Sequence, residues 1–275
     1  MTATSVSLII TTYERPQALS LVLDSLSRLT TFPLEVVIAD DGSTEPTKKV
    51  INDWQKKLPF RLIHAWQEDD GFRAAAARNK AAIASSGNYL IFLDGDCLVF
   101  PDFIQNHIQL SAHKKMVIGS RILCSKELTS EMESGLEKPL DWKLHSWIKA
   151  KFSKRINRVL PLIRLTDSWI RSLRGDKWKG VRTFNLAIWR DDFFAANGFD
   201  ERFQGWGHED ADLAIRLIKN GIQRKDGQFS IPVLHLWHQE SDRTKLNHNE
   251  KLLSDTLCSI TTRALLGIDQ YKQTR

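Results

Sequence analysis

The amino-acid sequence predicts an α/β fold in which a mostly parallel sheet is flanked by helices. Through the first hundred residues, short apolar runs rich in β-branched side chains alternate with longer amphipathic segments. Strands that alternate with helices form right-handed crossover units, and such units build a parallel sheet. The length of 275 residues, with 42% hydrophobic and 26% charged residues, suits one large globular domain or one domain with an appendage.

Seven elements account for the first part of the chain. Strands are predicted at residues 6–11, 34–39, 61–66 and 89–93, and helices at 15–29, 43–58 and 72–84. The first helix carries apolar side chains at helical spacing: Leu19, Val22, Leu23, Leu26 and Leu29. Pro16 stands near the start of that helix, Ser43 is the expected N-cap of the second, and Gly87 closes the third.

The pattern changes after residue 100. Strands are expected at 116–123 and 229–238, and helices from about Asp210 to Gly221 and over 249–266. The last helix should turn four apolar residues inward: Leu252, Leu253, Leu257 and Ile260. Residues 138–182 form a basic segment rich in tryptophan, which we expect to be a helical insertion.

Positive charge is concentrated in that segment. The chain has a net charge of +6, yet from Lys143 to Arg182 twelve basic residues face only Asp167 and Asp176. This stretch therefore carries +10 and the rest of the chain −4. Three interpretations stay open for residues 142–182: an anionic membrane surface, an acidic glycan, or a solvated basic face. Apolar residues are interleaved with the cations: Trp147, Ile148 and Phe152, and Ile163, Trp169 and Ile170.

Composition argues against several other classes of protein. No apolar run approaches the roughly 20 residues of a membrane-spanning helix, and the N-terminal residues lack the pattern of a signal peptide. Cys97, Cys124 and Cys258 are odd in number and contain no CxxC pair, which argues against a disulfide framework. We therefore expect a cytoplasmic protein, attached peripherally to the inner face of the cell membrane if residues 142–182 bind lipid.

Three strands of the predicted sheet end in polar residues, at 11–14, 40–42 and 94–96. Ligands of open α/β sheets bind beyond the carboxyl ends of the strands, so these ends should converge on one site. Asp94 and Asp96 can bind a divalent metal, act as acid and base, or be solvated in a loop. Their apolar flanks argue against a free loop, and two carboxylates this close raise each other's pKa without a cation. Such oxygen ligands suit Mg²⁺ or Mn²⁺.

Five motifs in a fixed order give the chain a resemblance to a known family. They are "TTYERP", "ADDGS", "ARN", "LDGD" and "GFDERFQGWGHEDADLAIRL". The chain resembles the family-2 glycosyltransferases of the GT-A fold. Its second half, with "GWGHED" and the histidine-containing residues 237–255, resembles the β-1,4-galactosyltransferases and the bacterial chondroitin-polymerase type. The resemblance implies a single Rossmann-like GT-A domain over 1–275, with a nucleotide-binding half at 1–100 and an acceptor-binding half at 101–275.

The resemblance also implies roles for individual residues. Nucleotide-sugar binding is implied for Thr11, Tyr13, Glu14, Asp41, Arg78, Asp94 and Trp206. Asp210 matches the catalytic base, with Glu209 beside it, and its expected place in a first helical turn favours an anion. Metal ligation is implied for Asp96, for His238 and, as a further ligand, for Asp94. The implied reaction is inverting transfer from a UDP-sugar, with Mn²⁺ or Mg²⁺, to a glycan or lipid-linked acceptor in cell-surface polysaccharide or lipopolysaccharide synthesis.

The sequence departs from the family pattern at two histidines. His208 stands where many relatives have glycine, and His235 is a second histidine near His238. On one continuous strand these two would face opposite sides, so both can bind one metal only if the strand ends between them. His238 is preferred as the ligand because it lies at the expected strand end and matches the resemblance.

Three other functions fit parts of the sequence less well than glycosyl transfer does. A nucleotidyltransferase should have a glycine-rich basic loop after its first strand, and "TTYERP" is not one. A nucleic-acid-binding protein fits the basic segment but not the acidic strand ends, so we expect no nucleic acid in the main site. A non-catalytic nucleotide-sugar-binding protein would not need the intact "LDGD" and "GHED" motifs.

Overall fold

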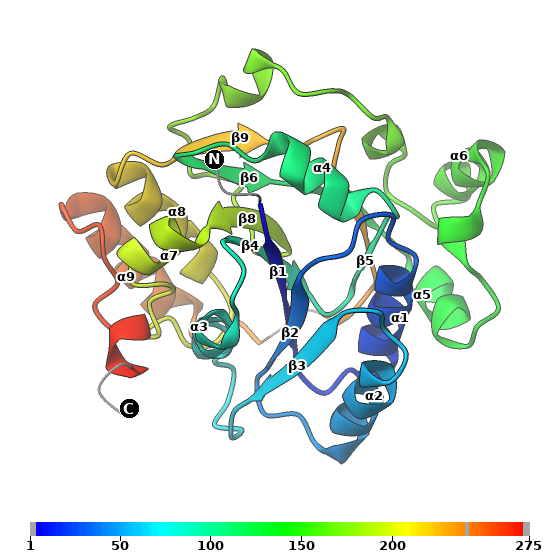
Figure 1. The fold of residues 1–275 in the computed structure, drawn as a ribbon, viewed down its shortest axis with the longest axis horizontal. Helices are drawn as coiled ribbons and strands as arrows, with labels where there is room; N and C mark the ends of the chain where they lie inside the picture. Colours follow the sequence, from blue (N-terminus) through cyan, green and yellow to red (C-terminus); the bar gives the residue numbers. More distant parts are fainter. Residues whose placement is uncertain (1–3, 240–241, 272–275) are drawn as a thin grey trace.

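The computed structural model describes residues 4–239 and 242–271 of the chain. Its centre is a seven-stranded sheet (Figure 1), whose strands in spatial order are β3 (Arg61–Trp66), β2 (Glu35–Asp40), β1 (Val6–Thr12), β4 (Tyr89–Asp94), β8 (Asn185–Trp189), β6 (Lys115–Ile118) and β9 (Gln223–Asp226). The first four are mutually parallel, whereas β8 is antiparallel to both of its neighbours. The predicted α/β class with a mostly parallel sheet is confirmed.

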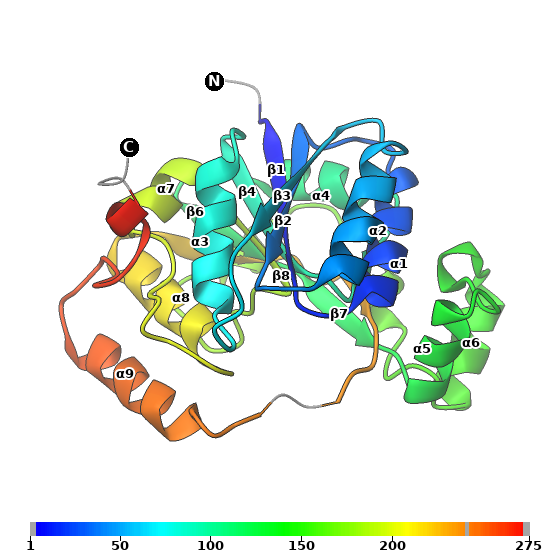
Figure 2. The ribbon, with the colours of Figure 1, turned by 90° about the horizontal axis from the view of Figure 1, so that it is seen from below.

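Helices cover both faces of this sheet (Figure 2). One apolar core includes residues of α1 (Pro16–Ser27), α2 (Glu45–Gln55) and α4 (Phe103–Leu110). The other core includes residues of α3 (Ala74–Ala84), α7 (Arg190–Ala195) and α8 (Glu209–Lys219). The five apolar residues predicted to face inward from the first helix are all buried. The period of the apolar pattern therefore gave the correct inner face.

A second sheet joins three short strands, β5 (Cys97–Val99), β10 (Pro232–His235) and β7 (Ser120–Leu123). It packs into the same core as α1. Two helices, α5 (Lys126–Glu133) and α6 (Leu144–Phe152), lie together at the edge of the molecule in both ribbon views (Figures 1 and 2). Helix α9 (Leu246–Cys258) packs beside α8. Short 3₁₀ turns complete the described chain: η1 (Pro139–Asp141), η2 (Leu160–Leu162), η3 (Trp169–Ser172) and η4 (Ile268–Tyr271).

The single strand predicted at 116–123 is wrong. It is two strands, β6 and β7, in two different sheets. Gly119 joins them, and a Cβ atom there would lie 2.0 Å from the side-chain Nδ2 of Asn185. The chain can change sheets at this point because glycine leaves room for the Asn185 side chain.

Four further expectations need correction. The strand predicted at 229–238 is ordered as β10 only from Pro232 to His235. The closing helix spans Leu246–Cys258 rather than 249–266, and Leu257 on it and Ile260 beyond its end are exposed rather than inward. Helix α2 begins at Glu45, so its N-cap is Thr44, and the Ser43 hydroxyl accepts a hydrogen bond from the Glu14 amide. The basic segment contains one α-helix, α6, while its remainder is 3₁₀ turns and loops.

Candidate active site

Arg78 connects three elements at the carboxyl ends of the parallel strands. Its guanidinium donates hydrogen bonds to Thr11 Oγ1 at 2.9 Å, to Asp94 Oδ1 at 3.2 Å and to Glu209 Oε1 at 3.0 Å. Burial alone would lower the pKa of Arg78, but the Asp94 and Glu209 carboxylates outweigh it and raise the pKa. Two of the three predicted strand ends, those of β1 and β4, therefore meet at Arg78, with α8 as a further contributor, and the end of β2 lies beside that of β1. We call Thr11, Arg78, Asp94, Glu209 and Asp210 the strand-end cluster.

The turn between Asp94 and Asp96 is tight and packs on the end of β1. The Gly95 amide donates to Thr11 O at 2.7 Å, and a Cβ atom on Gly95 would lie 2.7 Å from that same oxygen. Glycine at this position lets the two aspartates point to different partners. Burial raises the pKa of Asp94, and Arg78 opposes the increase.

Asp96 faces two histidines. Its Oδ1 lies 3.6 Å from His235 Nε2, and its Oδ2 lies 3.6 Å from His238 Nε2. The strand β10 ends at His235, and the Leu236 amide then donates to Asp96 O at 2.9 Å. Because the strand ends between the two histidines, their rings lie on the same side, with centroids 5.3 Å apart. The stated condition under which both histidines can reach one metal, a strand that ends between them, is therefore met.

This donor set fits a divalent cation with mixed oxygen and nitrogen ligands. Carboxylate and imidazole groups are ligands that Mn²⁺ accepts. Ligand atoms of Asp96, Cys97 and His235 lie within 4.8 Å of one another. Burial raises the pKa of the Cys97 thiol well above its ordinary value, so the group stays protonated and is a poor ligand. The metal candidates are therefore Asp96, His235 and His238, with Asp94 held by Arg78.

Arg15 is a site residue that the sequence reasoning missed. Its Nη1 lies 2.9 Å from Asp96 Oδ2, and Nη2 lies 3.7 Å from Glu133 and donates to Trp237 O at 3.3 Å. The guanidinium supplies the positive charge beside Asp96 in this structure. The signal was its place in "TTYERP", two residues after Tyr13.

Glu209 and Asp210 begin helix α8. His208 precedes them in a left-handed conformation with φ of 77°. The Asp210 carboxylate accepts a hydrogen bond from the Ala211 amide at 2.7 Å and lies 3.5 Å from Arg182 Nη1. Burial, reinforced by the Glu209 charge, raises the pKa of Asp210 to about 7. A carboxyl group with this pKa can take up and release a proton near neutral pH.

The other nucleotide candidates have different surroundings. Asp41 is buried and accepts hydrogen bonds from Gln67 Nε2 at 2.6 Å and from the Arg73 amide at 2.7 Å. Burial raises the pKa of Asp41. The exposed Tyr13 donates to Asp69 at 3.1 Å. The Glu14 carboxylate accepts hydrogen bonds from Thr44 at the start of α2 and is thereby tied to the helix rather than aimed at the strand-end cluster.

Trp206 stands in a loop that hydrogen bonds from helix α9 hold in place. It stands between Gly205 and Gly207, which have φ values of 71° and 110°. Asn249 of α9 is fully buried and donates to Gln204 O and Gly207 O, both at 3.0 Å. The exposed indole of Trp206 is covered on one face by the Arg243 guanidinium at 4.9 Å. The support of this loop by Asn249 is not part of the sequence prediction.

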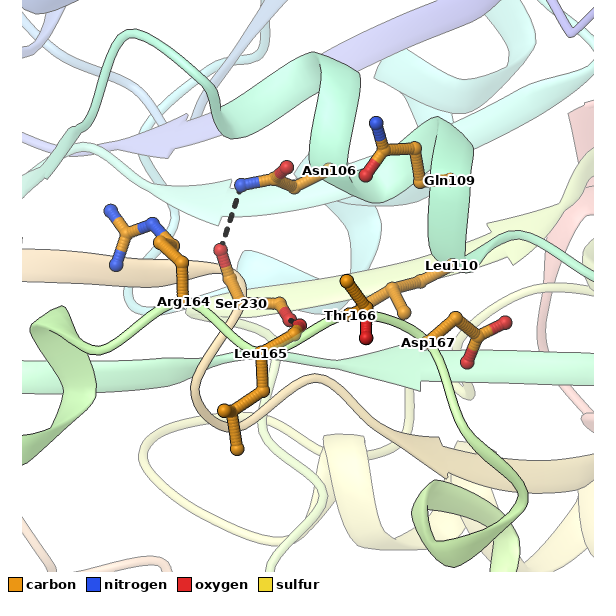
Figure 3. Close-up of a pocket in the computed structure, with 8 residues that line it drawn as sticks. All are labelled: Asn106, Gln109, Leu110, Arg164, Leu165, Thr166, Asp167 and Ser230. Atoms are coloured by element: carbon orange, nitrogen blue, oxygen red, sulfur yellow. Dashed lines mark hydrogen bonds between the residues drawn. The ribbon is translucent and has the colours of Figure 1, made fainter.

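Two cavities lie away from the strand-end cluster. One of about 130 Å³ lies between α4 and residues 164–167 (Figure 3), where Asn106 donates to the backbone oxygen of Ser230. The other, of about 260 Å³, lies between α1, α2 and residues 132–140. Neither is lined by a predicted site residue. Neither cavity therefore coincides with the strand-end cluster.

Comparison with known proteins agrees with this geometry. Residues 7–171 match glycosyl transferase family 2, and residues 174–239 match the N-terminal domain of galactosyltransferase. The chain is 31% identical to validoxylamine A glucosyltransferase of Streptomyces hygroscopicus subsp. limoneus, with 98% of this chain and 62% of that protein covered. It is 27% identical to chondroitin synthase of Escherichia coli, with 85% of this chain and 34% of the synthase covered.

Solved structures share the fold. S. aureus TarS 1–349 in complex with UDP-GlcNAc has a TM-score of 0.65 at 14% identity, with 98% of this chain and 70% of that chain covered. A mannosyltransferase from Pyrobaculum calidifontis in complex with GDP-Man and Mn²⁺ has a TM-score of 0.58 at 18% identity, with 86% and 57% covered. The fold is that of the GT-A glycosyltransferases. The chain belongs to glycosyl transferase family 2, as its motifs indicated.

Proposed function

We propose that the protein transfers a sugar from a UDP-sugar to a hydroxyl group of a glycan or lipid-linked saccharide, with inversion. The observation that carries this proposal is Asp210 of the strand-end cluster. Its carboxyl group is buried in the first turn of α8, its pKa is raised to about 7, and Arg78, Asp94 and Glu209 lie nearby. Family membership and relatives that are named as glucosyltransferase and chondroitin synthase support it.

Donor binding is assigned to the nucleotide-binding half, residues 1–100. Asp41 receives the uracil, because its two carboxylate oxygens are fixed by Gln67 and Arg73 at the end of β2. Thr11 and Tyr13 lie at the end of β1, beside the end of β2. Arg78 holds Asp94 in place for the ribose, and its charge favours an anionic ligand nearby. The TarS complex with UDP-GlcNAc supports a UDP-sugar as donor.

The diphosphate end of the donor is assigned to Asp96, His238 and His235, with Mn²⁺ or Mg²⁺ as the cofactor. Burial lowers the pKa of His235, so its imidazole is neutral and can coordinate. A bound divalent ion supplies positive charge that stabilises the nucleoside diphosphate as it leaves. Arg15 is paired with Asp96 in this structure and its side chain is partly exposed, so a metal held by Asp96 would have to displace it.

Asp210 is proposed as the general base on the acceptor side, residues 101–275. Its carboxylate takes the proton of the attacking hydroxyl, and that oxygen bonds to the anomeric carbon as the bond to the diphosphate breaks. Glu209, held by Arg78, orients a sugar hydroxyl beside it. Trp206 offers an apolar face against the sugar ring. Glu209 and Asp210 act from the first turn of α8, and Trp206 acts from the loop before it.

A panel of nucleotide-sugars, incubated with Mn²⁺ and read out as released nucleoside diphosphate, tests the donor assignment. Release of UDP from one UDP-sugar, stimulated by an oligosaccharide acceptor, is the expected result. Release of a sugar 1-phosphate, by transfer of the nucleotidyl group, would instead indicate a nucleotidyltransferase. Binding of a UDP-sugar without any release, with all acceptors tried, would contradict the catalytic proposal.

We further propose cell-surface polysaccharide or lipopolysaccharide synthesis on the cytoplasmic side of the membrane as the setting. Within the part of the chain that the structure describes, no helix has the length and apolar character needed to cross a bilayer.

A further inference from the structure

Helix α6 exposes an apolar stripe. Leu144, Ile148 and Phe152 are spaced four residues apart, so their side chains lie on one face of the helix. Their exposed fractions are 68%, 41% and 84%. The opposite face is buried through Trp147 and Ala150. The helix is thus anchored by one side and unpartnered on the other.

Lysines border this stripe. Lys149 and Lys151 lie on the helix itself, Lys143 is its N-cap and Lys154 follows its end. All four are exposed, and no ion pair joins any of them to another residue of the described chain. The helix contains no acidic residue. Its outer surface therefore combines exposed apolar side chains with uncompensated positive charge.

The arginines of the same basic segment are used differently. Arg155 pairs with Glu131 and Glu137, and Arg164 pairs with Asp102 at 2.7 Å. Arg158 donates to Arg121 O, and the buried Arg171 donates to the carbonyl oxygens of residues 165, 166, 226 and 228. These four fasten the segment to the body, whereas the lysines around α6 are left free to meet a partner.

The inner face of α6 is tied to the metal side of the candidate site. The Trp147 ring lies 5.9 Å from that of Phe100 and 5.2 Å from that of Trp142. Phe100 directly follows β5, the strand that begins one residue after Asp96. Both ribbon views show α6 projecting at the edge of the molecule beyond α1 (Figures 1 and 2). A surface bound to α6 would therefore lie at a fixed position relative to Asp96.

We propose that α6 docks the protein on an anionic lipid bilayer surface. A short helix with an apolar face flanked by lysines lies in the plane of the interface, its apolar side chains among the acyl chains and its lysines at the headgroups. Charge complementarity selects this occupant, because four unpaired lysines around three apolar residues would face one another across a contact between two copies. The docking stands on α6 alone, while its use to reach a lipid-linked acceptor rests on the proposed function.

Co-flotation of the full chain with vesicles tests the docking. Vesicles of phosphatidylcholine alone are compared with vesicles that also contain phosphatidylglycerol, at low salt and at about 1 M salt, where the Debye length is about 3 Å. We expect binding only with the anionic lipid and loss of it at high salt. Lys149→Gln with Lys151→Gln should weaken partitioning roughly 25-fold, at about fivefold per lysine near the surface. Phe152→Gln should weaken it roughly tenfold.

Matched variants separate a specific surface from bulk charge. Lys49→Gln with Lys56→Gln removes two exposed lysines of α2 and its C-cap, and Ile260→Gln removes an apolar residue that is 97% exposed. Both controls should float like the wild type. Equal flotation of the α6 variants and the wild type would overturn the proposal.

A different occupant gives a different result. If α6 bound a second copy of the chain, light scattering would show a dimer that Phe152→Gln dissociates, and anionic vesicles would float no protein. That outcome rejects the membrane surface. UDP release from the donor in solution should be unchanged in the lysine variants, so a failure of docking remains distinguishable from a failure of the proposed activity.

Discussion

The strand-end cluster and helix α6 are both rich in charge, but their charged side chains have opposite surroundings. In the cluster, the Arg78 guanidinium is buried and its nitrogens contact Thr11, Asp94 and Glu209. Around α6 the lysines are exposed and unpaired. A buried charge loses hydration and needs partners, whereas an exposed charge costs little. Substitutions in the strand-end cluster should therefore change catalysis or stability, and substitutions around α6 should change only the binding to a lipid surface.

The largest expected effect is that of Asp210→Asn. The amide cannot take a proton from the acceptor, so the rate of transfer should fall by about 10³, within the range for loss of a general base. UDP binding, measured by calorimetry with Mn²⁺, should be retained. Normal turnover in this variant would show that Asp210 is not the base.

A neighbour on the same helix should behave in the opposite way. Asp212 is fully buried, its carboxylate accepts two hydrogen bonds from Arg216 and one from Thr256, and it reaches none of the strand-end residues. Asp212→Asn leaves the Arg216 charge uncompensated, so urea unfolding should report a loss of about 3 to 5 kcal/mol. An unchanged midpoint would contradict the structural role given to this pair.

The metal candidates can be ranked by single substitutions. His238→Ala and His235→Ala should each weaken Mn²⁺ binding, followed by titration in the presence of UDP, by about tenfold or more. His248→Ala, an exposed histidine of α9, is the matched control and should have no effect. If only His238→Ala weakens binding, His235 is a structural partner of Asp96 rather than a ligand.

The smallest expected change is with pH. Asp210 must be ionised to act as a base, and burial raises its pKa from 3.8 to about 7. We expect kcat/KM to rise with pH through about 7 and then level off. The same group lowers stability as pH rises from about 4 to about 7, because the unfolded chain ionises first, and its contribution is constant above that window. A rise of kcat/KM centred near pH 4 would contradict the assignment of the buried Asp210 as the base.

The sequence predicts what is local and fails where distant segments meet. Alternating strands and helices were found because their periodicity lies within each segment, and parallel pairing then brings Thr11 beside Asp94. The split at Gly119 was missed because it depends on Asn185, which is 66 residues away. Arg15 reaches Asp96 across 81 positions and Asn249 reaches Gly207 across 42, so no local pattern reports these contacts.

The distinction between a buried carboxyl group that acts in catalysis and one that stabilises the fold is tested most directly within α8. Urea unfolding and UDP release in transfer assays are measured on the same preparations of Asp210→Asn and Asp212→Asn. We expect Asp210→Asn to unfold at the urea concentration of the wild type or above it while transfer is lost. We expect Asp212→Asn to unfold at lower urea while its folded molecules still transfer sugar. Loss of stability in Asp210→Asn with retained transfer, or the same response in both variants, would contradict the account.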